Sequence, residues 1–68
     1  MSRAPFEVLF EFRQVGEYVK VSAVDPLTNT EVAIVGSSRM SKEALKANAL
    51  RKLRYVIAKN RAAGGNEA

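Results

Sequence analysis

Residues 6–24 read FEVLFEFRQVGEYVKVSAV, and their alternation with a period of two decides the fold. Every second residue from Phe6 to Phe12 is valine or phenylalanine, as in a strand with one buried face. The alternation resumes over Glu17–Val24, and a glycine between the two runs supplies the positive φ that a tight turn needs. The stretch therefore predicts an antiparallel hairpin.

The simplest hairpin places its two-residue loop at Val15-Gly16, and a longer bulged loop is the alternative. This register pairs Phe12 with Val19 on the apolar face. On the other face it pairs Glu11 with Lys20, a favourable cross-strand pair.

A third strand is expected over Glu31–Val35. Asp25-Pro26 favours a turn before it, because aspartate accepts nearby backbone N–H groups and proline fixes φ. Asn29 tolerates the left-handed conformation. Pairing Val24 with Glu31 keeps the apolar residues of all three strands on one face, which predicts a meander.

The C-terminal third predicts one helix after a connector at 36–40. Ser41 is a good N-cap residue, the helix is expected from Lys42 to about Ala62, and Gly64-Gly65 should end it. Its apolar stripe falls within about a 140° arc at 100° per residue and should pack on the apolar sheet face: Leu45, Ala49, Leu50, Leu53, Val56 and Ile57. The expected fold is α+β, a three-stranded antiparallel meander with one C-terminal helix on one face, with a single domain at 1–62 and a flexible tail at 63–68.

The composition argues against an enzyme. The chain of 68 residues contains neither histidine nor cysteine, which removes the usual general base, the thiolate nucleophile and the commonest metal ligands. We therefore expect no catalytic residues, no cofactor and no metal. No export signal or apolar run long enough to span a membrane is present, so the expected compartment is the cytoplasm.

Positive charge is concentrated in the predicted helix. Residues 37–62 carry eight lysines and arginines and one glutamate, whereas residues 1–36 have a net charge of −2. A basic helix face that includes a tyrosine is typical of nucleic-acid binding, although an ordinary solvated helix face is the alternative. The candidate contacts to a nucleic-acid backbone are Lys42, Lys46, Arg51, Lys52, Arg54, Tyr55 and Lys59.

The sheet face opposite the helix indicates a second kind of surface. Its expected charges are three negative and two positive, which disfavours DNA there, and its apolar residues are expected to form a centre rimmed by charges. The two edge strands are also open to pairing. The alternative function is thus a protein-interaction module that binds a second copy or an acidic protein, with the candidate residues Leu9, Tyr18, Val24, Ala33 and Val35.

Residues 41–49, SKEALKANA, follow three strands and a glycine-containing connector. In this they resemble the βββα half of double-stranded RNA-binding domains. The resemblance implies that Lys42 and Lys46 contact phosphates across the major groove. Glu43 replaces the middle lysine of the motif, and the first helix of that family has no counterpart here.

A second resemblance covers most of the chain. Residues 16–26 (GEYVKVSAVDP), 30–36 (TEVAIVG) and 51–56 (RKLRYV) are similar to a family of small bacterial proteins of unknown function, some of which carry the label serine hydroxymethyltransferase. The resemblance implies no activity. A pyridoxal-phosphate enzyme needs a large pocket around a Schiff-base lysine, which one sheet face and one helix cannot enclose.

Overall fold

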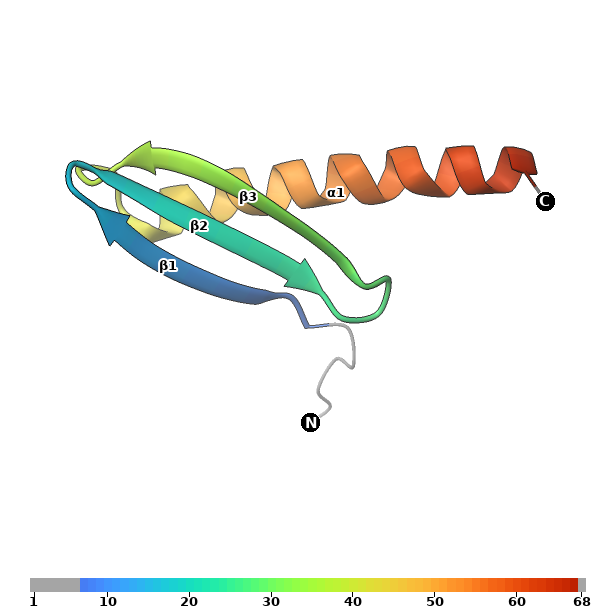
Figure 1. Ribbon diagram of the computed structural model, residues 1–68, viewed down its shortest axis with the longest axis horizontal. Helices are drawn as coiled ribbons and strands as arrows, with labels where there is room; N and C mark the ends of the chain where they lie inside the picture. Colours follow the sequence, from blue (N-terminus) through green and yellow to red (C-terminus); the bar gives the residue numbers. More distant parts are fainter. Residues whose placement is uncertain (1–6, 68) are drawn as a thin grey trace.

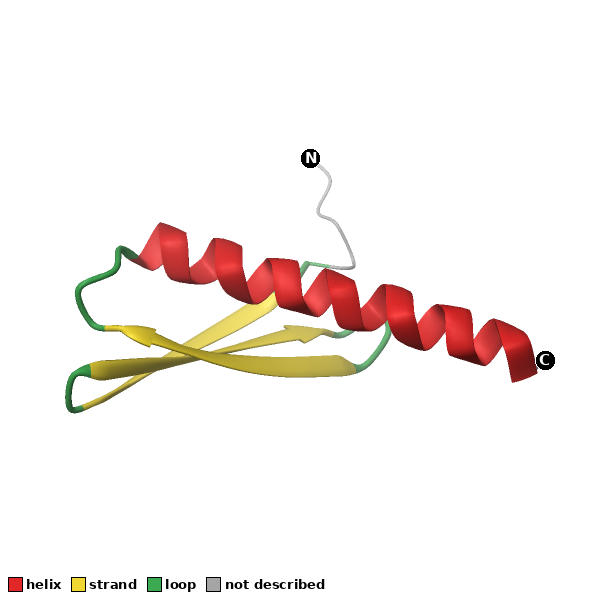
Figure 2. Cartoon of the chain, turned by 90° about the horizontal axis from the view of Figure 1, so that it is seen from above, coloured by secondary structure: helices red, strands yellow, loops and turns green. Residues whose placement is uncertain are grey.

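Three strands and one helix follow one another along the chain: β1 (Leu9–Val15), β2 (Tyr18–Asp25), β3 (Thr30–Ser37) and α1 (Lys42–Glu67). The computed structural model describes the backbone of residues 7–67 and the side chains of residues 7–62. The strands form one antiparallel sheet in the order β1-β2-β3 (Figure 1). Because α1 lies on one side of this sheet (Figure 2), the predicted β-β-β-α architecture is confirmed.

The first hairpin turns at Gly16-Glu17, one residue later than predicted. Val15 pairs with Tyr18 across a two-residue loop, and Gly16 has a φ of 62°. A positive φ at the first loop position suits glycine and matches the twist of the strands. The need for glycine at the first loop position therefore sets the position of the turn between β1 and β2.

The later turn changes which side chains face each other. Glu11 lies opposite Ser22 and Arg13 lies opposite Lys20, so the predicted Glu11–Lys20 pair is wrong. The partner of each β1 residue moves by two positions. An even shift leaves every side chain on its predicted face, because side-chain direction in a strand repeats every two residues.

The second hairpin confirms the predicted register, since Val24 pairs with Glu31. Asp25 is buried at its start, and its carboxylate accepts hydrogen bonds from the Leu27 N–H at 3.0 Å and the Thr28 hydroxyl at 3.1 Å. Asn29 takes the left-handed conformation with a φ of 58°. The loop chemistry read from the sequence thus holds the turn.

Strand lengths differ from the prediction at both ends of the sheet. β1 begins at Leu9, and Phe6, which was expected in the strand and the core, lies outside the described residues. β3 runs to Ser37, so Gly36 and Ser37 belong to the strand and not to the connector. They pair with Val19 and Tyr18, so β3 is paired with β2 as far as the first residue of β2.

The start of α1 agrees with the prediction and its end does not. The Ser41 hydroxyl accepts a hydrogen bond from the Ala44 N–H at 3.1 Å, which is the expected N-cap contact. The predicted end at Ala62 is wrong, because α1 continues through Gly64 and Gly65 to Glu67. Glycine costs about 1 kcal/mol in a helix relative to alanine, but it does not forbid the helical backbone.

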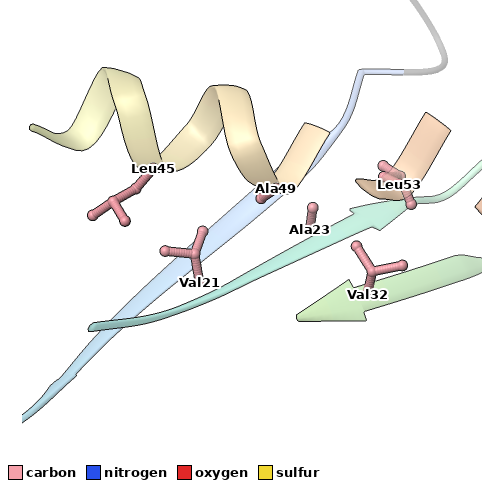
Figure 3. Close-up of a cluster of buried hydrophobic side chains, with 6 residues drawn as sticks. All are labelled: Val21, Ala23, Val32, Leu45, Ala49 and Leu53. Carbon is pink, nitrogen blue, oxygen red and sulfur yellow. The ribbon is translucent and has the colours of Figure 1, made fainter. Parts of the chain in front are cut away.

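The core lies between one stripe of α1 and the strands β2 and β3. Its buried side chains are Val21, Ala23, Val32, Leu45, Ala49 and Leu53 (Figure 3). α1 packs on β2 and β3, and the other apolar residues expected in the core surround this cluster as partly buried neighbours. Phe10 and Phe12 of β1 are among these half-buried residues, so the helix leaves one side of its sheet face incompletely covered.

Gly36 allows α1 to approach β3 closely. A Cβ at this position would collide with the Leu45 side chain and lie 3.3 Å from the Met40 sulfur. Gly36→Ala should therefore destabilise the fold by about 1–3 kcal/mol through overpacking, measured by urea denaturation. Trimming the neighbour should relieve the clash, so the double variant Gly36→Ala/Leu45→Val should cost less than the sum of the two single changes. Additive costs would contradict this explanation.

Candidate nucleic-acid interface

All the residues predicted to meet a nucleic-acid backbone lie on α1 with exposed side chains. They do not share one face. At about 100° per residue, Arg54 and Lys52 point about 160° apart around the helix axis. The predicted residues therefore lie on three surfaces of α1: the side toward β1, the side toward β3 and the surface that points away from the sheet.

The side of α1 toward β1 carries a basic row formed by Lys42, Lys46 and Arg54. At about 100° per residue, Lys46 lies about 40° from Lys42 around the helix axis and Arg54 about 80° further, so the row winds gradually around α1. The Lys42 ammonium lies 5.4 Å from the centre of the Phe12 ring, and the Lys46 ammonium lies 5.1 Å from the centre of the Phe10 ring. Contact with an aromatic face attracts a cation, so the two β1 phenylalanines help to position these lysines.

Arg54 extends the row along a groove between β1 and α1. The groove is open and has a volume of about 750 Å³. Phe10 and Phe12 form part of its lining on the sheet side, and Lys46, Leu50 and Arg54 line it on the helix side. The groove thus combines two half-buried aromatic side chains with two of the predicted cations, Lys46 and Arg54, and a third, Lys42, lies over Phe12.

Lys52 lies on the opposite side of α1, toward β3. Its ammonium donates a hydrogen bond to the backbone carbonyl of Ala33 at 3.0 Å. Lys59 follows seven residues later, which places it on the same side of the helix. The structure therefore separates Lys52 and Lys59 from the basic row.

Arg51 and Tyr55 occupy the remaining surface of α1, which points away from the sheet. Arg51 lies about 60° from Arg54 around the helix axis, and Tyr55 lies about 40° further round. Both side chains are exposed. Arg51 is close in direction to Arg54 but points about 140° away from Lys46, and Tyr55 lies between Arg51 and the Lys52 side.

Sequence reasoning placed Phe10 and Phe12 in the core and missed their exposure. A helix with its side chains is about 10–12 Å wide and strands are about 4.8 Å apart, so one helix covers two strands well and a third strand poorly. The presence of three strands and only one helix could therefore have predicted that one strand is incompletely covered. The number of elements could not have shown that the incompletely covered strand is β1.

The open face of the sheet inverts the predicted arrangement. Its middle is polar, and a shallow depression there is lined by Glu11, Arg13, Lys20, Ser22 and Glu31. The apolar side chains form a rim around this middle that is open on the β1 side. Leu9 lies opposite Val24 at one end of the rim, and Val15 lies opposite Tyr18 at the other. Ala33 and Val35 of β3 connect the two pairs. The rim contains all the predicted interface residues and one that was missed, Val15: Leu9, Val24, Ala33, Val35, Tyr18 and Val15.

The described side chains contain no group of three or more carboxylate, histidine or cysteine residues that could hold a metal ion. Across the same part of the chain, no helix combines the length and the apolar character needed to cross a bilayer.

Comparison with known proteins gives one relationship. Residues 5–60 match the model of a family described as a domain of unknown function (DUF6898). No curated protein and no solved structure is significantly similar to the chain. Because the match covers most of the 68 residues, the chain belongs to the DUF6898 family of domains of unknown function.

Proposed function

We propose that this domain is a non-enzymatic binding module that docks the phosphate backbone of a nucleic acid on α1. The observation that carries the proposal is the separation of charge between the two layers. Residues 37–62 hold eight cations against one carboxylate, whereas residues 1–36 have a net charge of −2. A polyanion is thus attracted to the helix layer and not to the sheet layer.

The contacts we assign are those of the basic row, Lys42, Lys46 and Arg54, together with Arg51. Along α1 the row extends about 18 Å at 1.5 Å per residue, which is long enough to meet several successive phosphates. Lysine and arginine contacts to phosphates position a protein without reading sequence. The resemblance of residues 41–49 to double-stranded RNA-binding domains supports Lys42 and Lys46 as phosphate contacts.

The two cations on the β3 side are assigned a smaller role. The Lys52 ammonium already donates to the Ala33 carbonyl, and Lys59 shares its side of the helix. A rigid duplex lying against the basic row would not reach them, because they point away from it. Tyr55, between the two sides, is placed to stack on an unpaired base or to hydrogen-bond a phosphate.

A binding role is favoured over catalysis by the chemistry of the chain. With no histidine or cysteine, the remaining nucleophile candidates are serines and lysines without the usual base. Two of those serines have structural roles: the Ser41 hydroxyl caps α1, and the Ser37 hydroxyl accepts a hydrogen bond from the Arg39 N–H.

The proposal is tested by fluorescence anisotropy with labelled duplex RNA, duplex DNA and single strands at increasing salt concentration. Contact with about four phosphates should give a log–log slope of affinity against salt of about −3 to −4 on duplex DNA. Affinity should not depend on base sequence, because the contacts are to phosphates. Absence of binding to every probe at low salt would overturn the proposal.

A further inference from the structure

The two edges of the sheet are treated differently by the fold. At the β3 edge, α1 packs on the strand, and the Lys52 ammonium occupies the Ala33 carbonyl at 3.0 Å. A lysine at a sheet edge is a common means of blocking the approach of another strand. The β3 edge is therefore protected by the chain itself.

The β1 edge has none of these protections between Leu9 and Val15. The strand reads LFEFRQV, which contains no lysine, proline or glycine, and its pairing with β2 is continuous and free of bulges. Antiparallel pairs alternate between hydrogen-bonded and non-hydrogen-bonded, and the Val15–Tyr18 pair that closes the two-residue turn is hydrogen-bonded. Phe10, Phe12 and Gln14 therefore direct their backbone N–H and C=O groups outward from the sheet.

The same alternation explains the contact at the other edge. If Val15 and Tyr18 form a hydrogen-bonded pair, the odd-numbered residues of β2 bond to β3, and the odd-numbered residues of β3 face outward. Ala33 is one of these, and its carbonyl is free to accept from Lys52 as observed. The outward direction of the Phe10, Phe12 and Gln14 backbone groups is thus consistent with a contact on the far side of the sheet.

We infer that a second copy of this chain pairs with β1, antiparallel about a twofold axis at Phe12, to form a continuous sheet of six strands. β1 spans seven residues centred on Phe12, so this axis pairs every residue of the strand with its copy. It also places Glu11 of each chain opposite Arg13 of the other, which gives two favourable charge pairs on the open face.

The neighbouring twofold registers are disfavoured by charge or by length. An axis at Glu11 would place the two Glu11 side chains opposite each other, and an axis at Arg13 would do the same with the two arginines. An axis at Phe10 would leave the C-terminal end of β1 opposite residues before Leu9, which are not part of the strand. The axis at Phe12 alone combines full-length pairing with opposite charges.

Apolar burial favours the same arrangement. Leu9 and Val15 are 57% and 61% exposed. The twofold axis places Leu9 of each chain opposite Val15 of the other chain. On the helix side, the Phe12 rings meet at the axis, next to the half-buried Phe10 and the groove that both phenylalanines line. Pairing would thus cover the strand that α1 leaves incompletely covered.

The small size of the domain also favours a partner. A typical specific interface takes about 800 Å² from each partner, and a core of this size gives little stability without such help.

The experiment is sedimentation velocity of the full chain from about 1 µM to 1 mM, with single and double charge reversals in β1. Glu11→Arg sets arginine against Arg13 of the partner, and Arg13→Glu sets glutamate against Glu11. Each should raise the dimer dissociation constant at least about tenfold, because the twofold axis applies the change twice. The double variant Glu11→Arg/Arg13→Glu restores opposite charges and should dimerise like the native chain.

Two controls make the result specific. Glu17→Arg changes the net charge as Glu11→Arg does, but it lies in the turn outside β1 and should leave the dimer intact. Val35→Glu introduces a charge into the exposed apolar rim of the open face, on β3, and should also leave the dimer intact. A native chain that stays monomeric throughout, or a dimer that Val35→Glu abolishes and the reversals spare, would overturn the inference. The sedimentation samples contain no nucleic acid, so failure of this inference is distinguishable from failure of the proposed function.

Discussion

Leu53→Ala is expected to leave most of the chain unfolded at room temperature. Leu53 is 1% exposed and belongs to the buried hydrophobic cluster of the described side chains, which has six members (Figure 3). Replacing a buried leucine by alanine costs about 2–5 kcal/mol, because the lost transfer free energy is added to the cost of the cavity. A domain of this size rarely has more than about 3–5 kcal/mol of stability in total. The measurement is far-UV circular dichroism with thermal and urea unfolding.

Leu27→Ala is the matched control for this substitution. It removes the same atoms from a leucine that is 65% exposed in the loop between β2 and β3. Its effect on the free energy of unfolding should stay within about 0.5 kcal/mol. Protein concentration must be held constant, because a dimer adds stability that depends on concentration. A Leu53→Ala variant that unfolds at the same urea concentration as the Leu27→Ala variant would contradict the assignment of the core.

Reversing two charges of the basic row should nearly abolish nucleic-acid binding. The double variant Lys46→Glu/Arg54→Glu replaces two phosphate contacts by repulsions while leaving the core untouched, since both side chains are exposed. A hydrogen bond to a charged group is worth about 1.5 kcal/mol or more, so two lost contacts should weaken binding about a hundredfold. The slope of affinity against salt should fall by about two. Anisotropy titrations at low salt measure both quantities.

The matched control is Lys52→Glu/Lys59→Glu. It changes the net charge by the same amount on the same helix, but on the side that faces β3. We expect less than about a tenfold loss, which long-range repulsion accounts for. Equal losses in the two double variants would show that binding follows net charge, and the assignment to the basic row would then be wrong.

The two hairpins show where a sequence pattern is strong and where it is weak. Asp25 and Asn29 each have one role that suits the loop between β2 and β3, and the register there follows the prediction. Gly16 suits either of two positions in a two-residue loop, and the alternation of side chains is the same in both. The pattern therefore settled the face of each residue in β1 but not its partner.

The candidate sites divide in the same way. Charge counting identified α1 as the basic element, because charge is a property of composition and needs no coordinates. It could not separate Lys52 from Lys46, because that difference depends on whether the side chain lies over Phe10 or reaches the Ala33 carbonyl. Likewise, the apolar rim of the open face depends on how three strands are placed side by side.

The order of elements can be predicted from the sequence alone. The same holds for the buried face of each strand, the N-cap of α1 at Ser41 and the excess of cations on the helix. These features follow from local periodicity and composition, which neighbouring residues in the chain express without distant contacts. Three features could be seen only in the folded chain: the register of the first hairpin, the strand that α1 leaves half covered and the edge at which Lys52 binds. These depend on where one helix of limited width settles on a wider sheet, and that position is set by packing between residues far apart in the chain.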